Sequence, residues 1–453
     1  MSRRRIALGL AANVYDKLLI AGIQLLMVPM LVLHWGLHLY GCWLVLATIP
    51  SFLALADMGF GGAAYLRMIA LVAQDKRDAA VVVLQTACQV VAIASVVVLI
   101  LALLVIYSVP GGWLPSDPAL SAGDARTVLA VLVLYALAVF QKMLQGAGYA
   151  SVQLAPLFSL TAAHVVLLEN ALLVAAVLAG YGPVVGAAAL VTGRIVGTLC
   201  QWLLLRRRAP WLRFGIARAD AAERRILARS AVGMIAIPLS AATALQGSVL
   251  ALSAAAGPVA APAFVAARTL SRIGLQATQL LTHALMPEFT AAHARGDRNG
   301  QAGMLLAVVG AAAFAALPFA LLIGLGGDWI LALWTKGMVT APPGLMPAIA
   351  LSVAFGGLWP PLSNLMLSID RHGSFAWPYL ALATLSVAAT YLLGRSFGAT
   401  GAALALAGLD ACMCLVVGRF AVKTWLHGLP LGTVARAQMA AVQERVFGRS
   451  GKG

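Results

Sequence analysis

The sequence predicts an all-α protein that crosses a membrane many times. Hydrophobic residues make up 62% of its 453 residues, charged residues make up only 10%, and the mean hydropathy is +0.94. No soluble core requires so large an apolar fraction, whereas polytopic membrane proteins have this composition. At roughly 20 residues a span with short links, the chain has room for about 12 transmembrane helices.

The apolar segments are separated by turn signals such as Gly257-Pro258 and Pro342-Pro343-Gly344. Six precede and six follow a basic segment. We therefore expect an amino-terminal six-helix bundle at 1–205, a basic cytoplasmic linker at 206–226, a second six-helix bundle at 227–425 and a cytoplasmic tail at 426–453 that forms an amphipathic helix. The expected spans are 7–33, 39–66, 80–108, 125–147, 153–180, 182–205, 227–252, 260–287, 302–326, 344–367, 374–394 and 399–422.

The two halves also look like a repeat. Asp75-Lys76 precedes the third span, and Asp297-Arg298 precedes the ninth, which is the third of the second half. Internal repeats around a central cavity are a common plan of transporters.

Basic residues orient the chain. Only Arg126, Lys336 and Arg395 fall in the expected outer loops, while most of the 31 Lys and Arg residues fall on the other side. Basic loops remain in the cytoplasm, which predicts that both termini are cytoplasmic. The net charge of +16 then reflects anchoring to inner-leaflet lipids and not a nucleic-acid partner. Seven basic residues remain within or at the edges of spans: Lys17, Lys142, Arg194, Arg229, Arg268, Arg272 and Arg419.

The first two spans form a helical hairpin that carries charges. Lys17 lies about 18 Å along the helix from Arg5, and Asp57 about 15 Å from Arg67, so the two charges have similar depth. Charges in the bilayer normally face a bundle interior or an aqueous cavity. Two interpretations remain open. Either Lys17 and Asp57 form an ion pair that locks the hairpin, or they line a transport cavity, with Lys17 contacting substrate and Asp57 coupling an ion.

The eighth span has the most polar face. Its polar residues fall within about 80° of arc on a helical wheel, and such a face does not contact lipid. The spans contain fewer carboxylates (Asp16, Asp57, Glu169 and Asp410) than basic residues, and an anionic substrate would balance the excess. Arg268, Arg272 and Gln276 are therefore candidate substrate contacts, with interhelical hydrogen bonds as the alternative. The full set of polar residues on this face is Arg268, Arg272, Gln276, Gln279 and His283.

Three further charges lie deep in spans. Arg194 either faces the cavity, as a substrate contact, or pairs with Glu169. Glu169 and Asp410 are candidates for proton or ion coupling because a carboxylate in a low-dielectric site titrates at raised pH. Trp359-Pro360-Pro361 must break or kink the tenth span, since proline lacks the amide hydrogen that the helix requires.

Motifs in the opening hairpin and at the end of the eighth span resemble the polysaccharide flippases called Wzx, members of the multidrug/oligosaccharidyl-lipid/polysaccharide exporter superfamily. The resemblance implies two six-helix bundles in a MATE-like V shape with alternating access. The implied substrate is an undecaprenyl-diphosphate-linked oligosaccharide, moved across the bacterial inner membrane for lipopolysaccharide or exopolysaccharide biosynthesis beside a polysaccharide polymerase. Lys17, Arg194, Arg268 and Arg272 match the idea of a cationic lumen. The matching residues are Asn13, Lys17, Pro29, Tyr40-Gly41, Trp43-Leu44, Pro50-Ser51, Leu53, Leu55, Asp57, Gly59, Met286-Pro287-Glu288-Phe289 and Gly296-Asp297.

Two other functions remain. One is another exporter of the same superfamily, for drugs or for another lipid-linked precursor, although a drug-cation exporter would want an acidic cavity. The other is an inner-membrane polysaccharide polymerase or ligase. We find no catalytic triad, no metal-ligand spacing among the five cysteines and no nucleotide-binding loop. We therefore expect no enzyme activity, no cofactor and no metal.

Overall fold

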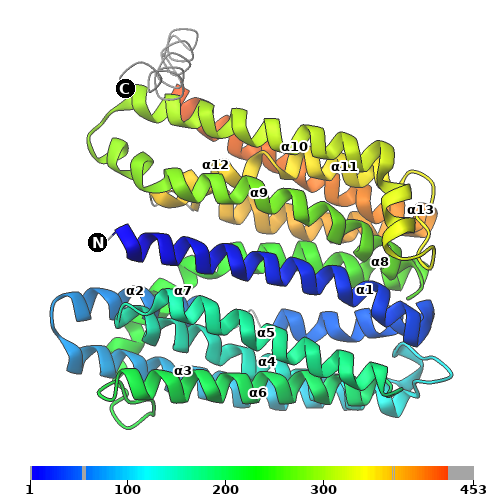
Figure 1. Cartoon of the computed structure of the whole chain (residues 1–453), viewed down its shortest axis with the longest axis horizontal. Helices are drawn as coiled ribbons and strands as arrows, with labels where there is room; N and C mark the ends of the chain where they lie inside the picture. The colour runs from blue at the N-terminus through cyan, green and yellow to red at the C-terminus, as the bar shows by residue number, and fades with distance from the viewer. Residues whose placement is uncertain (1–2, 54–57, 370, 372, 427–453) are drawn as a thin grey trace, which may run out of the picture. The chain divides into compact units, whose positions relative to one another are not determined.

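The computed structural model describes residues 3–53, 58–369, 371 and 373–426, and its regular elements there are all helices (Figure 1). The prediction of an all-α fold is therefore confirmed. Nine of the described helices are long and apolar enough to cross a membrane. Two of the nine are interrupted, at Gly36 and Gly398, and contain two passes each, so that the described helices fit the expected number of about 12 spans.

The first half of the chain begins with a helical hairpin, as predicted. The two arms form one continuous element, α1, but Gly36 interrupts its helical backbone with φ 76° and ψ 167°, a conformation that favours glycine. The turn therefore falls within the expected 34–38 link. The helices of this half are α1 (Arg3–Leu53), α2 (Met58–Ala73), α3 (Arg77–Ser108), α4 (Ala122–Ser151), α5 (Ala155–Leu178) and α6 (Pro183–Arg208), with a short 3₁₀ turn η1 (Gly111–Trp113).

The second half contains two interrupted spans. Gly398, with φ 54°, divides α13 into the expected eleventh and twelfth passes. The tenth pass breaks between α11 and α12, next to Trp359-Pro360-Pro361, as the sequence predicts. The elements are α7 (Ala221–Ala242), the π-helix η2 (Thr243–Gly247), α8 (Ser248–Ala256), α9 (Ala260–Ala294), α10 (Arg298–Trp334), α11 (Leu345–Gly356), α12 (Trp359–Ser368), α13 (Gly373–Ala421) and the π-helix η3 (Val422–Leu426).

The linker is shorter than the sequence suggests. The helix α6 continues to Arg208, and α7 begins at Ala221 because the Asp220 carboxylate accepts a hydrogen bond from the Glu223 amide, 2.9 Å away, as an N-cap. Only residues 209–220 are non-helical. The helix α10 is longer than expected and runs to Trp334. The expected tail helix lies at 427–453, outside the described residues.

The chain divides into two compact units, and the division does not fall in the linker. The first unit is Met1–Ala263 with Trp334–Val339, and the second is Phe264–Leu333 with Thr340–Gly453. The first unit includes α7 and α8 because α7 packs against α2 and α3. There the Arg67 guanidinium donates two hydrogen bonds of 2.6 Å to the Glu223 carboxylate. This bidentate pair, which links the seventh pass to the second, is not evident from the order of elements along the chain.

Glycines on α6 allow it to pack closely on α5 in the first unit. A Cβ at Gly193 would lie 2.5 Å from the Cα of Glu169, and one at Gly197 would lie 2.7 Å from a methyl group of Val165. Small residues permit this close approach between helices within a membrane. As Figure 1 shows, α4, α5 and α6 run side by side, and they contact one another along their length.

The proposed repeat has a structural counterpart in two turns. Between α2 and α3, Asp75 has φ 59° and the Lys76 amide donates to the Leu71 carbonyl. Between α9 and α10, Gly296 has φ 68° and the Asp297 amide donates to the Ala292 carbonyl. Both are Schellman-like helix ends with a left-handed residue. In the structure Asp75 is therefore equivalent to Gly296. The sequence comparison had aligned Asp75 with Asp297, which is one residue later.

We expect Gly193→Ala to destabilise the protein by about 1–3 kcal/mol, because the added methyl group overlaps the α5 backbone and forces the helices apart. The midpoint of thermal unfolding in detergent measures this loss. The matched control is Gly22→Ala on α1, where a Cβ meets nothing within 4 Å. It should leave the midpoint unchanged or raise it slightly. Equal midpoints for the two variants would contradict the close packing of α5 and α6.

Candidate functional site

A buried ion pair lies at the middle of the first unit. The Arg194 Nη2 atom of α6 is 2.8 Å from the Glu169 Oε1 atom and 2.7 Å from the Oε2 atom of α5. Their side chains are 8% and 4% exposed. Of the two interpretations that the sequence left open for Arg194, the structure therefore contains the pair with Glu169.

Tyr135 of α4 completes this cluster. Its hydroxyl donates to the Glu169 carboxylate at 3.1 Å and accepts from Arg194 Nη2 at 3.0 Å. The Arg194 guanidinium also lies over the Tyr135 ring, 5.3 Å from its centroid. These hydrogen bonds offset part of the cost of burying two charges, although the buried Arg194 Nε atom has no hydrogen-bond partner within the described residues. Three helices, α4, α5 and α6, are thus joined through one polar cluster.

The cluster lies at the depth that the sequence assigned to Lys17. Glu169 follows the start of α5 by 14 residues, and Arg194 precedes the end of α6 by 14. Lys17 also follows the start of α1 by 14 residues. At 1.5 Å per residue, all three lie about 21 Å from the helix ends on that side, which is near the centre of a bilayer core of about 30 Å plus its interface.

Two lysines lie near this cluster and are exposed. Lys142 of α4 and Lys17 of α1 both present exposed side chains. Neither forms an ion pair within the described part of the chain. Asp57, the partner that the sequence suggested for Lys17, lies outside the described residues. Lys142 is within electrostatic range of four other charged side chains: Asp16, Lys17, Glu169 and Arg194.

His164 of α5 extends the polar surface of the first unit toward α1. Its Nδ1 donates to the Leu160 carbonyl at 2.7 Å, which leaves Nε2 as the acceptor for the Tyr15 hydroxyl at 3.5 Å. The Tyr15 and His164 rings are also stacked, with centroids 5.7 Å apart. This contact joins α1 to α5 at Tyr15, two residues before Lys17.

The second unit contains a carboxylate bound to a broken helix. Asp410 of α13 accepts hydrogen bonds from the Ser352 hydroxyl of α11, at 2.5 Å, and from the Trp359 indole of α12, at 3.0 Å. A Cβ at Gly356, where α11 ends, would lie 3.1 Å from the Asp410 carboxylate. Cys414 donates its thiol to the Phe355 carbonyl at 3.1 Å. Within the described residues no basic side chain pairs with Asp410.

Arg268 and Arg272 lie one turn apart on α9 in the same unit. The Arg268 side chain is buried and its guanidinium lies over the Phe264 ring, 5.2 Å from the centroid. The Arg272 side chain is exposed. The described residues contain no ion pair to Arg272. Gln276 continues α9 by one further turn, but its side chain lies outside the described part.

No protein-family model and no curated protein matches this sequence. Solved structures do match. An inward-facing multidrug resistance MATE family transporter of the MOP superfamily gives a TM-score of 0.73, with 13% identity over 92% of this chain and 99% of that chain. The chain has a MATE-like fold. A lipid II flippase, MurJ, in an inward closed conformation gives a TM-score of 0.68, with 12% identity over 97% of this chain and 93% of that chain.

A third structure shares the MATE-like fold. It is a MOP superfamily transporter from Pyrococcus furiosus, with a TM-score of 0.57 and 14% identity over 93% of this chain and 94% of that chain. The fold class expected from the sequence is therefore confirmed, and the chain is a multi-pass membrane protein. Two of these three structures are named as members of the MOP superfamily, which is the superfamily that the sequence resembles. At such identities the likeness concerns the fold, and the substrate has to be argued from the residues of this chain.

Sequence reasoning missed three partners within the candidate sites. Tyr135 lies seven residues before Lys142, so both occupy one face of α4, and that spacing is the signal that would have found it. The sequence did not link Ser352 and Trp359 to Asp410. The two residues reach the same carboxylate only because the chain breaks between α11 and α12. Nothing in the local sequence indicates that contact.

We expect Glu169→Leu and Arg194→Met to destabilise the protein by about 3–5 kcal/mol each, because each leaves one buried charge without its partner. The double variant should be more stable than either single variant, since it removes both charges. Thermal unfolding of the purified protein measures the cycle. If the losses of the two single variants simply add in the double variant, the two side chains are not coupled.

Proposed function

We propose that this protein is a flippase for an undecaprenyl-diphosphate-linked oligosaccharide. It would move the repeat unit from the cytoplasmic to the outer leaflet of the bacterial inner membrane, for lipopolysaccharide or exopolysaccharide biosynthesis. Both termini are cytoplasmic in this proposal. A single observation carries it: Lys17, Lys142 and Arg272 are exposed on membrane-spanning helices and lack ion pairs in the described part of the chain.

An unpaired cation deep within a span, such as Lys17, requires an aqueous surface. A lysine or arginine facing lipid at the bilayer centre costs about 2.5–3.5 kcal/mol even on the gentler insertion scales. In this proposal these side chains face water, and each of them attracts an anionic substrate. In the first unit, three basic groups (Lys17, Lys142 and Arg194) stand against two carboxylates (Asp16 and Glu169).

A diphosphate suits such a surface. Arginine binds phosphate through parallel hydrogen bonds, and lysine contributes a point charge. In this mechanism Lys17, Arg268, Arg272 and Gln276 contact the diphosphate and its first sugar. Arg194 acts differently from the sequence-based expectation, because its guanidinium is held by Glu169 and Tyr135. It contributes to the positive field and not to direct substrate contact.

The MATE-like fold supports this mechanism in a general way. Two of the matched structures are named a multidrug resistance transporter and a lipid II flippase. Alternating access allows the glycan and diphosphate to cross through an aqueous cavity while the polyprenyl tail stays in lipid. A polysaccharide polymerase on the outer side would then consume the exported unit.

Three carboxylates were expected to couple an ion, and they differ in their surroundings. Glu169 is paired with Arg194, so a proton there would break a buried ion pair. Asp57 lies outside the described residues. Asp410 is held by two neutral donors, which leaves its negative charge available to a proton or a small cation. Asp410 is therefore the coupling residue that we propose.

The second candidate function is export of drugs or of another lipid-linked precursor. It is favoured by the TM-score of 0.73 with a multidrug transporter, of which 99% is covered. A cationic drug would be repelled by Lys17, Lys142 and Arg272, whereas an anionic precursor would not. Drug susceptibility of cells lacking the gene separates the two functions.

Deletion of the gene should abolish the surface polysaccharide. Complete single repeat units should accumulate on the cytoplasmic side of the inner membrane, because assembly continues and translocation stops. Extraction of the lipid-linked fraction with mass spectrometry measures this accumulation. An unchanged polysaccharide and an unchanged lipid precursor would contradict the proposal, and raised drug sensitivity in the same cells would favour the multidrug exporter.

Arg272→Ala should reduce glycan export at least tenfold while the protein still inserts, because it removes a charge-assisted contact to the diphosphate. Arg272→Lys should retain part of the export. The control is Arg395→Ala: Arg395 is also exposed but lies beside Gly398, where the eleventh pass ends. Surface glycan measured at matched protein levels decides the outcome, and equal export by the two alanine variants would exclude Arg272 from the site.

Asp410→Asn should leave the thermal midpoint near that of the wild type, because the amide retains an acceptor for the Ser352 or Trp359 donor. Transport in vesicles should lose its dependence on an imposed proton or sodium gradient. Asp410→Leu, which removes both hydrogen bonds, should lower the midpoint as well. If Asp410→Asn transports with unchanged gradient dependence, Asp410 only fastens the broken helix.

A further inference from the structure

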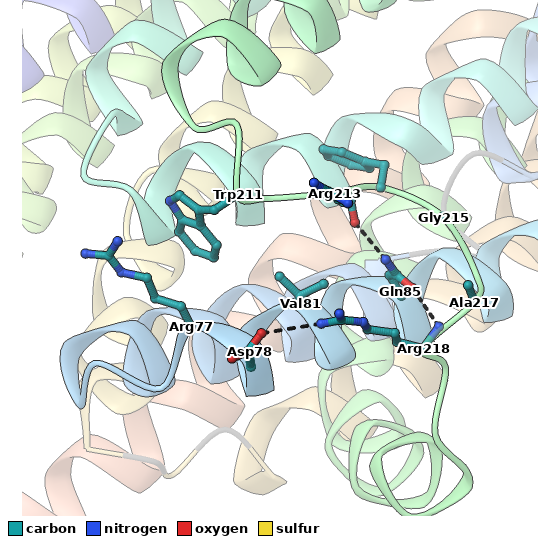
Figure 2. A pocket seen from close by; sticks show the side chains of 10 residues that line it. Arg77, Asp78, Val81, Gln85, Trp211, Arg213, Gly215, Ala217 and Arg218 are labelled. Atoms are coloured by element: carbon teal, nitrogen blue, oxygen red, sulfur yellow. Dashed lines mark hydrogen bonds and ion pairs between the residues drawn. The ribbon is translucent and has the colours of Figure 1, made fainter.

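The segment that joins α6 to α7 covers a cavity of about 540 Å³ on the first unit (Figure 2). We call residues 209–220 the strap. One wall of the cavity is α3, with Arg77, Asp78 and Gln85, and the other is the strap, with Trp211 to Arg218. Figure 1 shows this end of the unit beside the start of α1 and the turn between α2 and α3. On the basis of the basic loops, this is the cytoplasmic end.

The strap is held in place by two buried side chains of α3. The Gln85 amide nitrogen donates to the Arg213 carbonyl at 3.0 Å, and its oxygen accepts from the Arg218 amide at 2.7 Å. The Thr86 hydroxyl accepts from the Asp220 amide at 3.0 Å. Gln85 is 6% exposed and Thr86 is fully buried. A basic segment that only oriented the chain would need no such fixed shape.

The cavity is lined by more positive than negative charge. Its lining contains three arginines, Arg77, Arg213 and Arg218, and one carboxylate, Asp78. Arg218 is 3.3 Å from Asp78, but these side chains are 60% and 99% exposed, so the pair is weak. Arg77 similarly contacts Asp75 at 3.5 Å in the open. Arg213 forms no ion pair within the described residues.

A second cavity of about 540 Å³ lies on the other side of Arg213, between the strap and the end of α6. Each cavity has an arginine over a tryptophan ring. Arg77 lies 5.7 Å from the Trp211 centroid, and Arg206 lies 5.4 Å from the Trp202 centroid. Tryptophan and arginine gather at the level of lipid headgroups. The apolar side chain of Phe214 lines both cavities.

We propose that the strap cavity binds the phosphate of an anionic phospholipid of the inner leaflet. Arg77, Arg213 and Arg218 hold the headgroup phosphate, and Trp211 and Phe214 contact the upper acyl region. Clusters of arginines on the cytoplasmic side of membrane helices bind anionic headgroups. The apolar side chains beside the arginines favour a phosphate carried by a lipid over a soluble one.

Titration of the full-length protein in detergent with phosphatidylglycerol, followed by native mass spectrometry, tests the site. We expect Arg213→Ala to weaken binding about fivefold and the pair Arg213→Ala/Arg218→Ala about 20-fold. The matched control is Arg225→Ala, which removes the same charge from an exposed position on α7 outside both cavities. Equal weakening by Arg225→Ala would overturn the proposal in favour of non-specific attraction.

Gln85→Ala separates a shaped site from a charged surface. It removes the two hydrogen bonds of Gln85 to the strap, leaves the one of Thr86, and keeps every charge in place. Phosphatidylglycerol should bind this variant several-fold more weakly, with the thermal midpoint recorded to confirm that the protein is folded. Wild-type affinity in a folded Gln85→Ala protein would overturn the proposal.

Two further probes identify the source of the phosphate. Phosphatidylcholine should bind more weakly than phosphatidylglycerol, because its headgroup carries no net charge. Inorganic phosphate in large excess should leave phosphatidylglycerol bound. Displacement of the lipid by inorganic phosphate would overturn the lipid assignment and make the strap a site for a soluble anion. Neither result depends on the transported substrate, so the flippase proposal stands or falls separately.

Discussion

This structure depends on one constraint: an unpaired charge inside the membrane, away from water, costs a large free energy. In the first unit it is met by Arg194, Glu169 and Tyr135, whose hydrogen bonds join α6, α5 and α4. The pair lies where two helices approach closely, since Gly193 allows the α5 backbone to come within contact distance of α6. Removal of one partner would leave the other charge buried and unpaired where two helices pack closely. We therefore assign Arg194 a structural role and not a substrate contact.

The second unit satisfies the same constraint without an ion pair at its broken helix. The break between α11 and α12 frees backbone groups, and Pro360 and Pro361 cannot donate hydrogen bonds. The thiol of Cys414 satisfies the Phe355 carbonyl, and Asp410 accepts from Ser352 and Trp359 on the two sides of the break. Within the described residues no basic side chain pairs with the Asp410 carboxylate. This difference from Glu169 is what makes Asp410 the better candidate for a coupled ion.

Three groups of basic residues within the described part of the chain thus differ in their roles. Arg194 and Arg67 are paired with glutamates and hold helices together. Lys17 and Lys142 in the first unit and Arg272 in the second are exposed on spans, and from these side chains we infer an anionic substrate. Arg77 and Arg206 line the cavities beside the strap, and each lies over a tryptophan ring. Net charge alone does not separate these groups, because the separation depends on what each side chain contacts.

Composition and periodicity were sufficient to determine the fold class, the hairpin at Gly36, the break at Trp359-Pro360-Pro361 and an intramembrane excess of positive charge. These features are local: apolar length fixes a span, and glycine or proline fixes a turn or a break. The tertiary structure alone decided that Arg194 pairs with Glu169, that Tyr135 joins them, and that α7 packs on α2 through Arg67 and Glu223. Such contacts join residues that are 25 to 156 positions apart. A helical sequence fixes which face a residue occupies, but which other helix meets that face depends on packing of the whole bundle.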